Sequence, residues 1–158
     1  MKYRTVKRAL AVSLAAVMTA GMLSGCGKKT ETNEKGEEVV ELVWYQVGDA
    51  QKDAPKVLEK VNEYTEEKIG VKIKVNNVAW GDYNQKMQVV INTGDDWDMC
   101  FTCSWANDYL QNAQKGAFLE LDDLLKEEGK EMYDAIDQRF WEAAKVGGVT
   151  YGVPSEKE

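Results

Sequence analysis

Aspartates gather in two short stretches of the sequence, and paired carboxylates can carry out acid–base chemistry. Asp95, Asp96 and Asp98 lie close together, and Asp122 is followed directly by Asp123. Glycoside hydrolysis needs two carboxylates held at a fixed separation across a sugar. These aspartates fall in predicted turns and at predicted helix starts, where Asp commonly caps a helix. We therefore expect no catalytic residue, and a secreted carbohydrate-active enzyme is kept as an alternative hypothesis.

Histidine is absent, and Cys100 and Cys103 form a C-x-x-C pair. The absence of histidine excludes His-based triads and most zinc sites. A redox C-x-x-C pair usually begins a helix, whose dipole lowers a thiol pKa, but this pair falls on a predicted strand. Side chains three apart on a strand point to opposite faces, so a disulfide would need a local distortion. We expect two buried small side chains there, with no metal and no cofactor.

The first residues of the chain have the pattern of a secretory signal, in which Lys2, Arg4, Lys7 and Arg8 precede an apolar run. That run, residues 9–23, is shorter than the ~20 residues of a membrane-spanning helix. It ends in Leu23-Ser24-Gly25-Cys26, which resembles a bacterial lipobox. The resemblance implies that residues 1–25 are a signal peptide and that lipid, with palmitate among its fatty acids, is attached to Cys26. We expect a lipoprotein anchored at the extracytoplasmic face of the cell membrane.

Without that leader, 16 Lys and Arg residues oppose 27 Asp and Glu residues, which gives a net charge of −11. Nucleic-acid binding depends on Lys and Arg that neutralise phosphates, so we expect no nucleic-acid partner. Residues 27–38 contain no apolar side chain. We expect residues 26–38 to form a flexible tether and residues 39–158 to form the folded domain.

Apolar periodicity and capping residues divide the rest of the chain into alternating strands and helices. Asp82 with Gln85 predicts a capping box, Asn107 predicts another cap, and Gly147-Gly148 predicts a β-hairpin. This alternation predicts an α/β fold with a mainly parallel sheet flanked by helices. The predicted elements are strands at 39–47, 71–75 and 97–103, helices at 53–70, 82–94 and 107–116, helical stretches at 122–125 and 132–144, and a hairpin at 146–154.

Aromatic and polar residues follow the predicted strands, at the carboxyl ends where open α/β sheets bind ligands. Sugars present flat C–H faces and hydroxyl edges, which suit aromatic platforms combined with hydrogen-bonding groups. Tryptophan is also a common core residue, and we expect Trp97 and Trp141 to be core. The candidate ligand-binding residues are Trp44, Tyr45, Gln46 and Asp49 after the first strand, Trp80 and Asp82 after the second, Ser104, Trp105 and Asn107 after the third, and Tyr151 near the end of the chain.

Five segments in this order resemble family 1 of the bacterial extracellular solute-binding proteins, which serve ABC importers. They are Leu42–Gly48, Glu67–Val75, Trp80–Asp95, Trp97–Leu125 and Gly147–Glu156. The resemblance implies a periplasmic-binding-protein-like lobe, a small-molecule ligand such as a sugar or oligosaccharide, and ABC permease subunits as partners.

Members of that family enclose the ligand between two lobes. A segment like Tyr151–Pro154 lies near the point where their chain leaves the first lobe, and here the sequence ends at Glu158. We therefore expect an N-terminal fragment in which the second lobe is absent and whose affinity for the ligand is negligible, since half of the cleft is missing. The alternatives are a fragment of a secreted carbohydrate-active enzyme and a complete single-domain surface lipoprotein.

Overall fold

The computed structural model describes residues 31–32, 36 and 38–155. The expected signal peptide and the expected lipid site at Cys26 lie outside these residues. Within the described part of the chain, no helix is both long and apolar enough to cross a bilayer.

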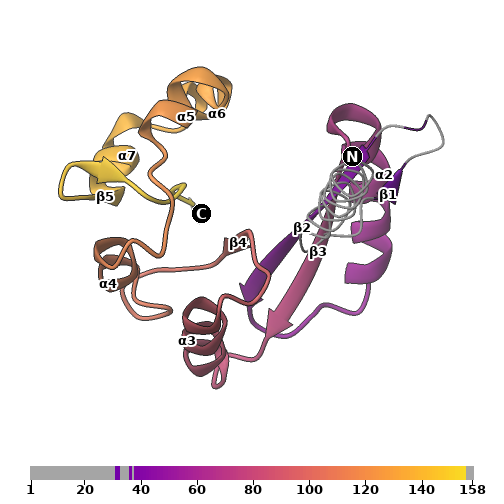
Figure 1. The fold of residues 1–158 in the computed structure, drawn as a ribbon, viewed down its shortest axis with the longest axis horizontal. Coiled ribbons are helices and arrows are strands. Elements are labelled where there is room, and N and C mark those ends of the chain that lie inside the picture. The colour runs from indigo at the N-terminus through magenta and orange to yellow at the C-terminus, as the bar shows by residue number, and fades with distance from the viewer. Residues whose placement is uncertain (1–30, 33–35, 37, 156–158) are drawn as a thin grey trace, which may run out of the picture.

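A small sheet built around one long strand organises the fold (Figure 1). The central strand β2 (Glu38–Val47) pairs in parallel with β3 (Val71–Val78) on one side and with the short β4 (Met99–Cys100) on the other. The start of β2 pairs antiparallel with β1 (Glu31–Thr32). Part of the predicted tether is therefore paired strand, because backbone hydrogen bonding to β2 needs no apolar side chain. The prediction of a parallel sheet with flanking helices is confirmed.

Helix α2 (Ala54–Ile69) protects the outer edge of β3 with hydrogen-bonding side chains. The Asn62 side-chain amide donates to the Ile73 carbonyl (3.0 Å) and accepts from the Ile73 N–H (2.8 Å). This amide takes the place of a neighbouring strand at Ile73, so the edge cannot pair with another chain at that residue. The predicted end of the helix is confirmed, since Gly70 adopts the left-handed conformation that closes many helices.

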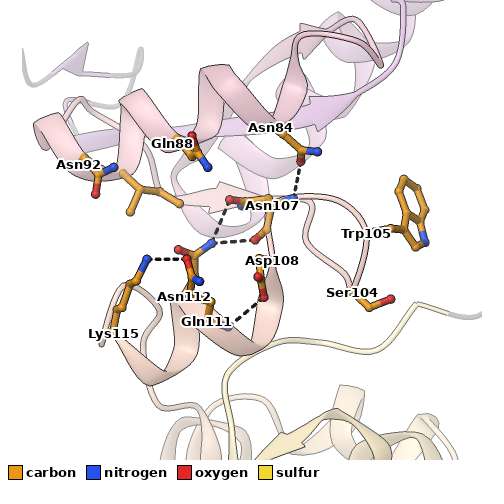
Figure 2. A pocket seen from close by; sticks show the side chains of 11 residues that line it. Asn84, Gln88, Asn92, Ser104, Trp105, Asn107, Asp108, Gln111, Asn112 and Lys115 are labelled. Atoms are coloured by element: carbon orange, nitrogen blue, oxygen red, sulfur yellow. Dashed lines mark hydrogen bonds between the residues drawn. The ribbon is translucent and has the colours of Figure 1, made fainter.

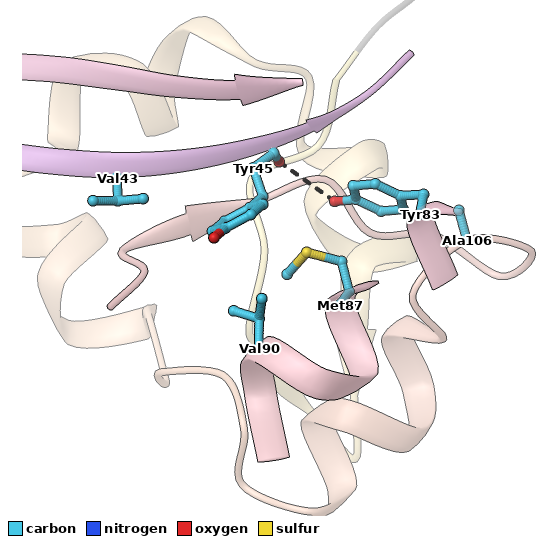
Figure 3. Close-up of a cluster of buried hydrophobic side chains, with 6 residues drawn as sticks. All are labelled: Val43, Tyr45, Tyr83, Met87, Val90 and Ala106. Carbon is cyan, nitrogen blue, oxygen red and sulfur yellow. Dashed lines mark hydrogen bonds between the residues drawn. The ribbon is translucent and has the colours of Figure 1, made fainter. Parts of the chain in front are cut away.

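Helix α3 (Tyr83–Thr93) supplies half of the main buried cluster. The buried cluster consists of Val43, Tyr45, Tyr83, Met87, Val90 and Ala106 (Figure 3). The spacing of Tyr83, Met87 and Val90 places them on one face of the helix, toward β2. The Tyr83 hydroxyl donates to the Phe101 carbonyl (2.6 Å). Burial raises the pKa of Tyr83, so the hydroxyl keeps the proton that this bond requires.

The third predicted strand, at 97–103, is correctly located but too long. Strand β4 comprises only two residues, because the Asp98 carboxylate accepts the Val43 N–H (2.8 Å) that a longer strand would bond through its backbone. The Asp98 N–H in turn donates to the Val43 carbonyl (2.9 Å). After Phe101, whose N–H still bonds to β2, the chain leaves the sheet.

Three predicted helix caps are wrong, at Asp82, Asn107 and Asp122. Asp82 precedes α3 but makes no side-chain capping bond, because its own backbone is already helical. Helix α4 (Tyr109–Gln114) is capped by Asp108, whose carboxylate accepts the Gln111 N–H (3.0 Å). Asn107, the predicted cap, lies one residue earlier with a left-handed backbone (φ 53°).

Short helices and a hairpin follow α4 and form a group at one end of the molecule (Figure 1). These elements are α5 (Asp122–Glu127), α6 (Lys130–Ala135), α7 (Gln138–Ala144), β5 (Lys145–Val146) and β6 (Val149–Thr150). The single helix predicted at 132–144 is divided, because Ile136 is extended and Asp137 caps α7.

The hairpin prediction is confirmed by the backbone of its turn. Gly147 and Gly148 both have positive φ angles (62° and 90°), which two-residue hairpin turns favour. Asp122, at the start of α5, joins the hairpin to that helix through two hydrogen bonds. Its carboxylate, instead of capping the helix, accepts from the Thr150 N–H (3.0 Å) and hydroxyl (3.1 Å).

Replacement of Met87 tests the packing of α3 on the sheet. Met87 has no exposed surface, so Met87→Ala is expected to lower the free energy of unfolding by roughly 2–5 kcal/mol. Gln85→Ala, on the solvent side of the same helix, is expected to change it by less than about 0.5 kcal/mol. Urea unfolding followed by circular dichroism measures both, and equal losses would contradict the described core.

Candidate functional site

Two exposed tryptophans lie where the carboxyl ends of the parallel strands meet. Trp80 follows β3 and Trp105 follows β4, and their rings stack with centroids 5.6 Å apart and planes inclined by 25°. The two residues are 60% and 62% exposed. Phe101 packs beside Trp105 with its centroid 6.0 Å away. The strand ends therefore present an aromatic surface to solvent.

A tight turn after β3 holds Trp80 at this edge. The Ala79 carbonyl accepts the Asp82 N–H (3.0 Å), and Trp80 lies within the turn that this bond closes. Gly48, at the end of β2, lies beside the indole, and a Cβ added to it would come 3.4 Å from the indole nitrogen. Its φ of 108° is one that residues with a side chain rarely adopt. The backbone conformation, more than the space beside the indole, therefore favours glycine at this position.

Asn107 fixes the loop that carries Trp105. Its N–H donates to the Asn84 side-chain oxygen on α3 (2.7 Å). Its carbonyl accepts from the Thr102 hydroxyl (3.0 Å) and from the Asn112 side-chain amide on α4 (2.7 Å). Asn107 is 6% exposed, so these bonds are shielded from competing water. The loop is joined in this way to both neighbouring helices.

The ten predicted ligand-binding residues occupy three different settings. Asp49, Trp80, Asp82, Ser104 and Trp105 are exposed, Trp44, Gln46 and Tyr151 are half-buried, and Tyr45 and Asn107 are buried. Only Trp80 and Trp105, among these ten, make a described aromatic contact with each other.

Two of the ten are buried, and a third lies beside the C-terminal hairpin. Tyr45 belongs to the core, because side chains alternate along β2 and its ring points toward α3 (Figure 3). Asn107 uses its polar groups within the protein, as described above. Tyr151 lies with the hairpin, where its N–H donates to the Tyr109 hydroxyl (3.2 Å). We remove the buried Tyr45 and Asn107 from the candidate set, whereas Tyr151, whose side chain is half-buried, stays a prediction.

A polar groove lies between α3 and α4 and was not predicted from the sequence. It has a volume of about 320 Å³, and Ser104 and Trp105 lie at one end of it (Figure 2). A signal for it was visible in the sequence, because Asn84, Gln88 and Asn92 recur every four residues and so share one face of α3. The remaining lining residues are Ile91, Asn107, Asp108, Gln111, Asn112 and Lys115.

Cys100 and Cys103 are free thiols and are half-buried. Burial raises the pKa of the Cys100 thiol to about 11, although the hydrogen bond from the Asn107 amide to Sγ (3.4 Å) acts in the opposite direction. A thiol that stays protonated near neutral pH is a poor nucleophile and metal ligand. Across the described residues, no three His, Cys, Asp or Glu side chains gather closely enough to hold a metal ion.

Three of the five aspartates considered for acid–base chemistry have described structural partners in the fold. The Asp98 carboxylate bonds to Val43 in the sheet, and the Asp122 carboxylate bonds to Thr150 in the hairpin. Asp123 is exposed and pairs with Lys126 (3.2 Å). Asp98 and Asp122 thus stabilise the sheet and the hairpin, and Asp123 lies in an exposed ion pair.

Known proteins of one family match this chain. Residues 48–155 match the family model for bacterial extracellular solute-binding proteins. A carbohydrate ABC transporter substrate-binding protein from Streptococcus pneumoniae serotype 4 is 36% identical over 146 residues, covering 90% of this chain and 29% of that protein.

Solved structures agree with that match. The N-glycan transport solute binding protein NgtS from Streptococcus pneumoniae, in complex with Man5GlcNAc, superposes with a TM-score of 0.67 at 36% identity, over 73% of this chain and 24% of that one. CpMnBP1 with mannotriose bound superposes with a TM-score of 0.54 at 27% identity, over 73% of this chain and 28% of that one.

This chain spans 29% of the length of its curated relative. That relative and NgtS are named as substrate-binding and solute-binding proteins, which are not enzymes. The family model covers more than half of the chain, and the solved structures share its α/β architecture. The chain therefore belongs to the bacterial extracellular solute-binding protein family.

Proposed function

We propose that this chain is the carbohydrate-binding component of an ABC importer, and that an oligosaccharide stacks on the Trp80–Trp105 pair. The exposed stacked pair at the strand ends is the observation that carries the proposal. An aromatic face suits the C–H face of a sugar ring, and exposed polar groups nearby suit its hydroxyls. The exposed candidates for hydrogen bonding to the sugar hydroxyls are Asp49, Asp82 and Ser104.

The spacing of the two rings limits how a sugar can bind. A sugar ring inserted between them would need a separation of about 8 Å, because it would make a van der Waals contact of ~4 Å on each side. The centroids are only 5.6 Å apart. A sugar therefore stacks on an outward face of the pair, which needs no movement of either loop.

The substrate class is supported by the relatives. NgtS and CpMnBP1 were solved with Man5GlcNAc and with mannotriose, and both compounds are oligosaccharides. The curated relative is named as a carbohydrate ABC transporter protein. By the same relationship, we propose ABC permease subunits as partners of this chain.

Attachment to the membrane forms a separate part of the proposal. The sequence Leu23-Ser24-Gly25-Cys26 and the apolar run before it support a diacylglycerol anchor on Cys26. Such an anchor would hold the domain at the extracytoplasmic face of the membrane, where a receptor meets both its ligand and its permease.

Circular dichroism tests the stacking of the tryptophans. Two indoles in contact couple their transitions, so we expect an exciton couplet in the far-ultraviolet spectrum. Trp80→Ala and Trp105→Ala should each abolish the couplet, whereas Trp97→Phe, which leaves the pair intact, should retain it. A couplet that survives both alanine substitutions would contradict the stacked arrangement.

Titration with mannotriose, followed by ¹⁵N NMR, tests the ligand site. The indole N–H signals of Trp80 and Trp105 should shift, while that of the buried Trp141 should not. Trp105→Ala should weaken binding by up to roughly tenfold, since an aromatic contact contributes about 0.5–1.5 kcal/mol beyond its buried area.

The tripeptide trialanine is the control ligand in that titration. An equal response to trialanine would contradict the substrate class, and hydrolysis of mannotriose during the titration would favour the enzyme alternative.

Metabolic labelling with an alkyne analogue of palmitate tests the anchor. The protein expressed with its leader should incorporate the label and sediment with membranes. Cys26→Ser should lose both properties, and Cys103→Ser should retain both. Label on the Cys26→Ser protein would show that another residue is lipidated and would refute the proposed site.

A further inference from the structure

The groove between α3 and α4 is lined mainly by side-chain amides (Figure 2). A volume of about 320 Å³ places it in the range of small-molecule sites, roughly 300–1,000 Å³. The amides from the two sides are Asn84, Gln88, Asn92, Asn107, Gln111 and Asn112.

Part of this lining is held rigidly by internal hydrogen bonds. Asn84 and Asn112 both bond to Asn107, as the loop that carries Trp105 requires. The charged groups at the rim are also engaged. The Lys115 ammonium donates to the Gln111 side-chain oxygen (2.6 Å), and Asp108 caps α4.

Two amides are available for a ligand. Gln88 and Asn92 are exposed on the α3 side of the groove, and neither side chain has a hydrogen-bond partner within the described part of the chain. Each offers two N–H donors and an oxygen acceptor without net charge. Between them Ile91 contributes an apolar, half-buried surface.

This combination fits a polyhydroxylated, uncharged ligand. A sugar hydroxyl is both donor and acceptor, and a primary amide can satisfy both functions. The apolar Ile91 side chain can contact the C–H face of a ring. Lys115 and Asp108 carry opposite charges, so the rim has no net charge and favours neither an anion nor a cation strongly.

Trp105 connects the groove to the tryptophan pair. It lines the groove and also stacks on Trp80. We infer that the groove is a second saccharide subsite, which takes the sugar units that continue from a unit stacked on the pair. This inference rests on the proposed function, because the first unit must bind at the tryptophans.

The double variant Gln88→Ala/Asn92→Ala tests the subsite. Both positions are exposed on a helix, so alanine should leave the fold intact. Affinity for mannotriose should fall by at least roughly fivefold, given typical hydrogen-bond contributions of about 0.5–1.5 kcal/mol each. Affinity for the monosaccharide mannose should stay unchanged, because one unit occupies only the tryptophan pair.

Gln85→Ala is the matched control, since it removes the same type of side chain from α3 but outside the groove. It should leave both affinities unchanged. In the parent protein, mannotriose should shift the side-chain NH₂ signals of Gln88 and Asn92 in ¹⁵N NMR, and mannose should not.

The outcomes separate this inference from the proposed function. If mannotriose shifts the Trp80 and Trp105 indole signals but leaves the groove amides unmoved, the subsite is refuted and the proposed function stands. If the double variant loses no more affinity than Gln85→Ala, the subsite is likewise refuted. If neither sugar shifts any of these signals, both the proposed function and the subsite are refuted.

Discussion

Strand β2 pairs in parallel with β3 on one side and with β4 on the other, and the rest of the structure depends on this arrangement. Trp44 and Tyr45 of β2 each pair with a residue of both neighbours, so the three strands end at the same edge. Parallel strands need a crossover between them, and α2 and α3 are those crossovers. Trp80 and Trp105 follow the two outer strands. Their contact is therefore a consequence of topology, although many residues separate them in the sequence.

The first two residues of α3 transmit this constraint to the loop that carries Trp105. The Tyr83 hydroxyl holds the start of that loop through the Phe101 carbonyl, and the Asn84 side chain holds its end through the Asn107 N–H. Adjacent residues of a helix point in different directions. One of them can thus enter the core while the other faces the groove. The same helix buries one face against the sheet and presents a row of amides on another, so the aromatic surface and the groove are fixed relative to each other.

Local sequence signals predicted the order of the elements because each signal has a local cause. Gly70 and Gly147-Gly148 mark a helix end and a turn because positive φ angles favour glycine there. The signals that failed depend on distant partners. The Asp98 side chain shortens β4 because it bonds to Val43 of β2. The Asp122 side chain does not cap α5 because it bonds to Thr150 in the hairpin.

The direction in which side chains point explains why some predicted ligand-binding residues are buried. Trp44 and Tyr45 are adjacent aromatic residues on β2, and their side chains point to opposite faces of the sheet. Only the position of α3 decides which of the two belongs to the core. The rule for strand ends found both tryptophans, since it follows from topology alone. It missed Gln88 and Asn92, because a polar helix face resembles any solvated surface until a second helix is known to lie opposite it.

For the oligosaccharide ligand that we propose, the contact between the two rings also limits the direction of approach. A stacked aromatic pair contributes about 0.5–1.5 kcal/mol, and a sugar that separated the rings would lose that contribution. A sugar on an outward face keeps that contribution. It meets two segments that are already ordered, one by Asn107 and the other by the turn between Ala79 and Asp82, so little conformational entropy is lost on binding. Trp105 already has one face against Trp80 while it lines the groove. The path that preserves the stack therefore leads a chain of sugar units along α3, past Gln88 and Asn92, and not between the rings.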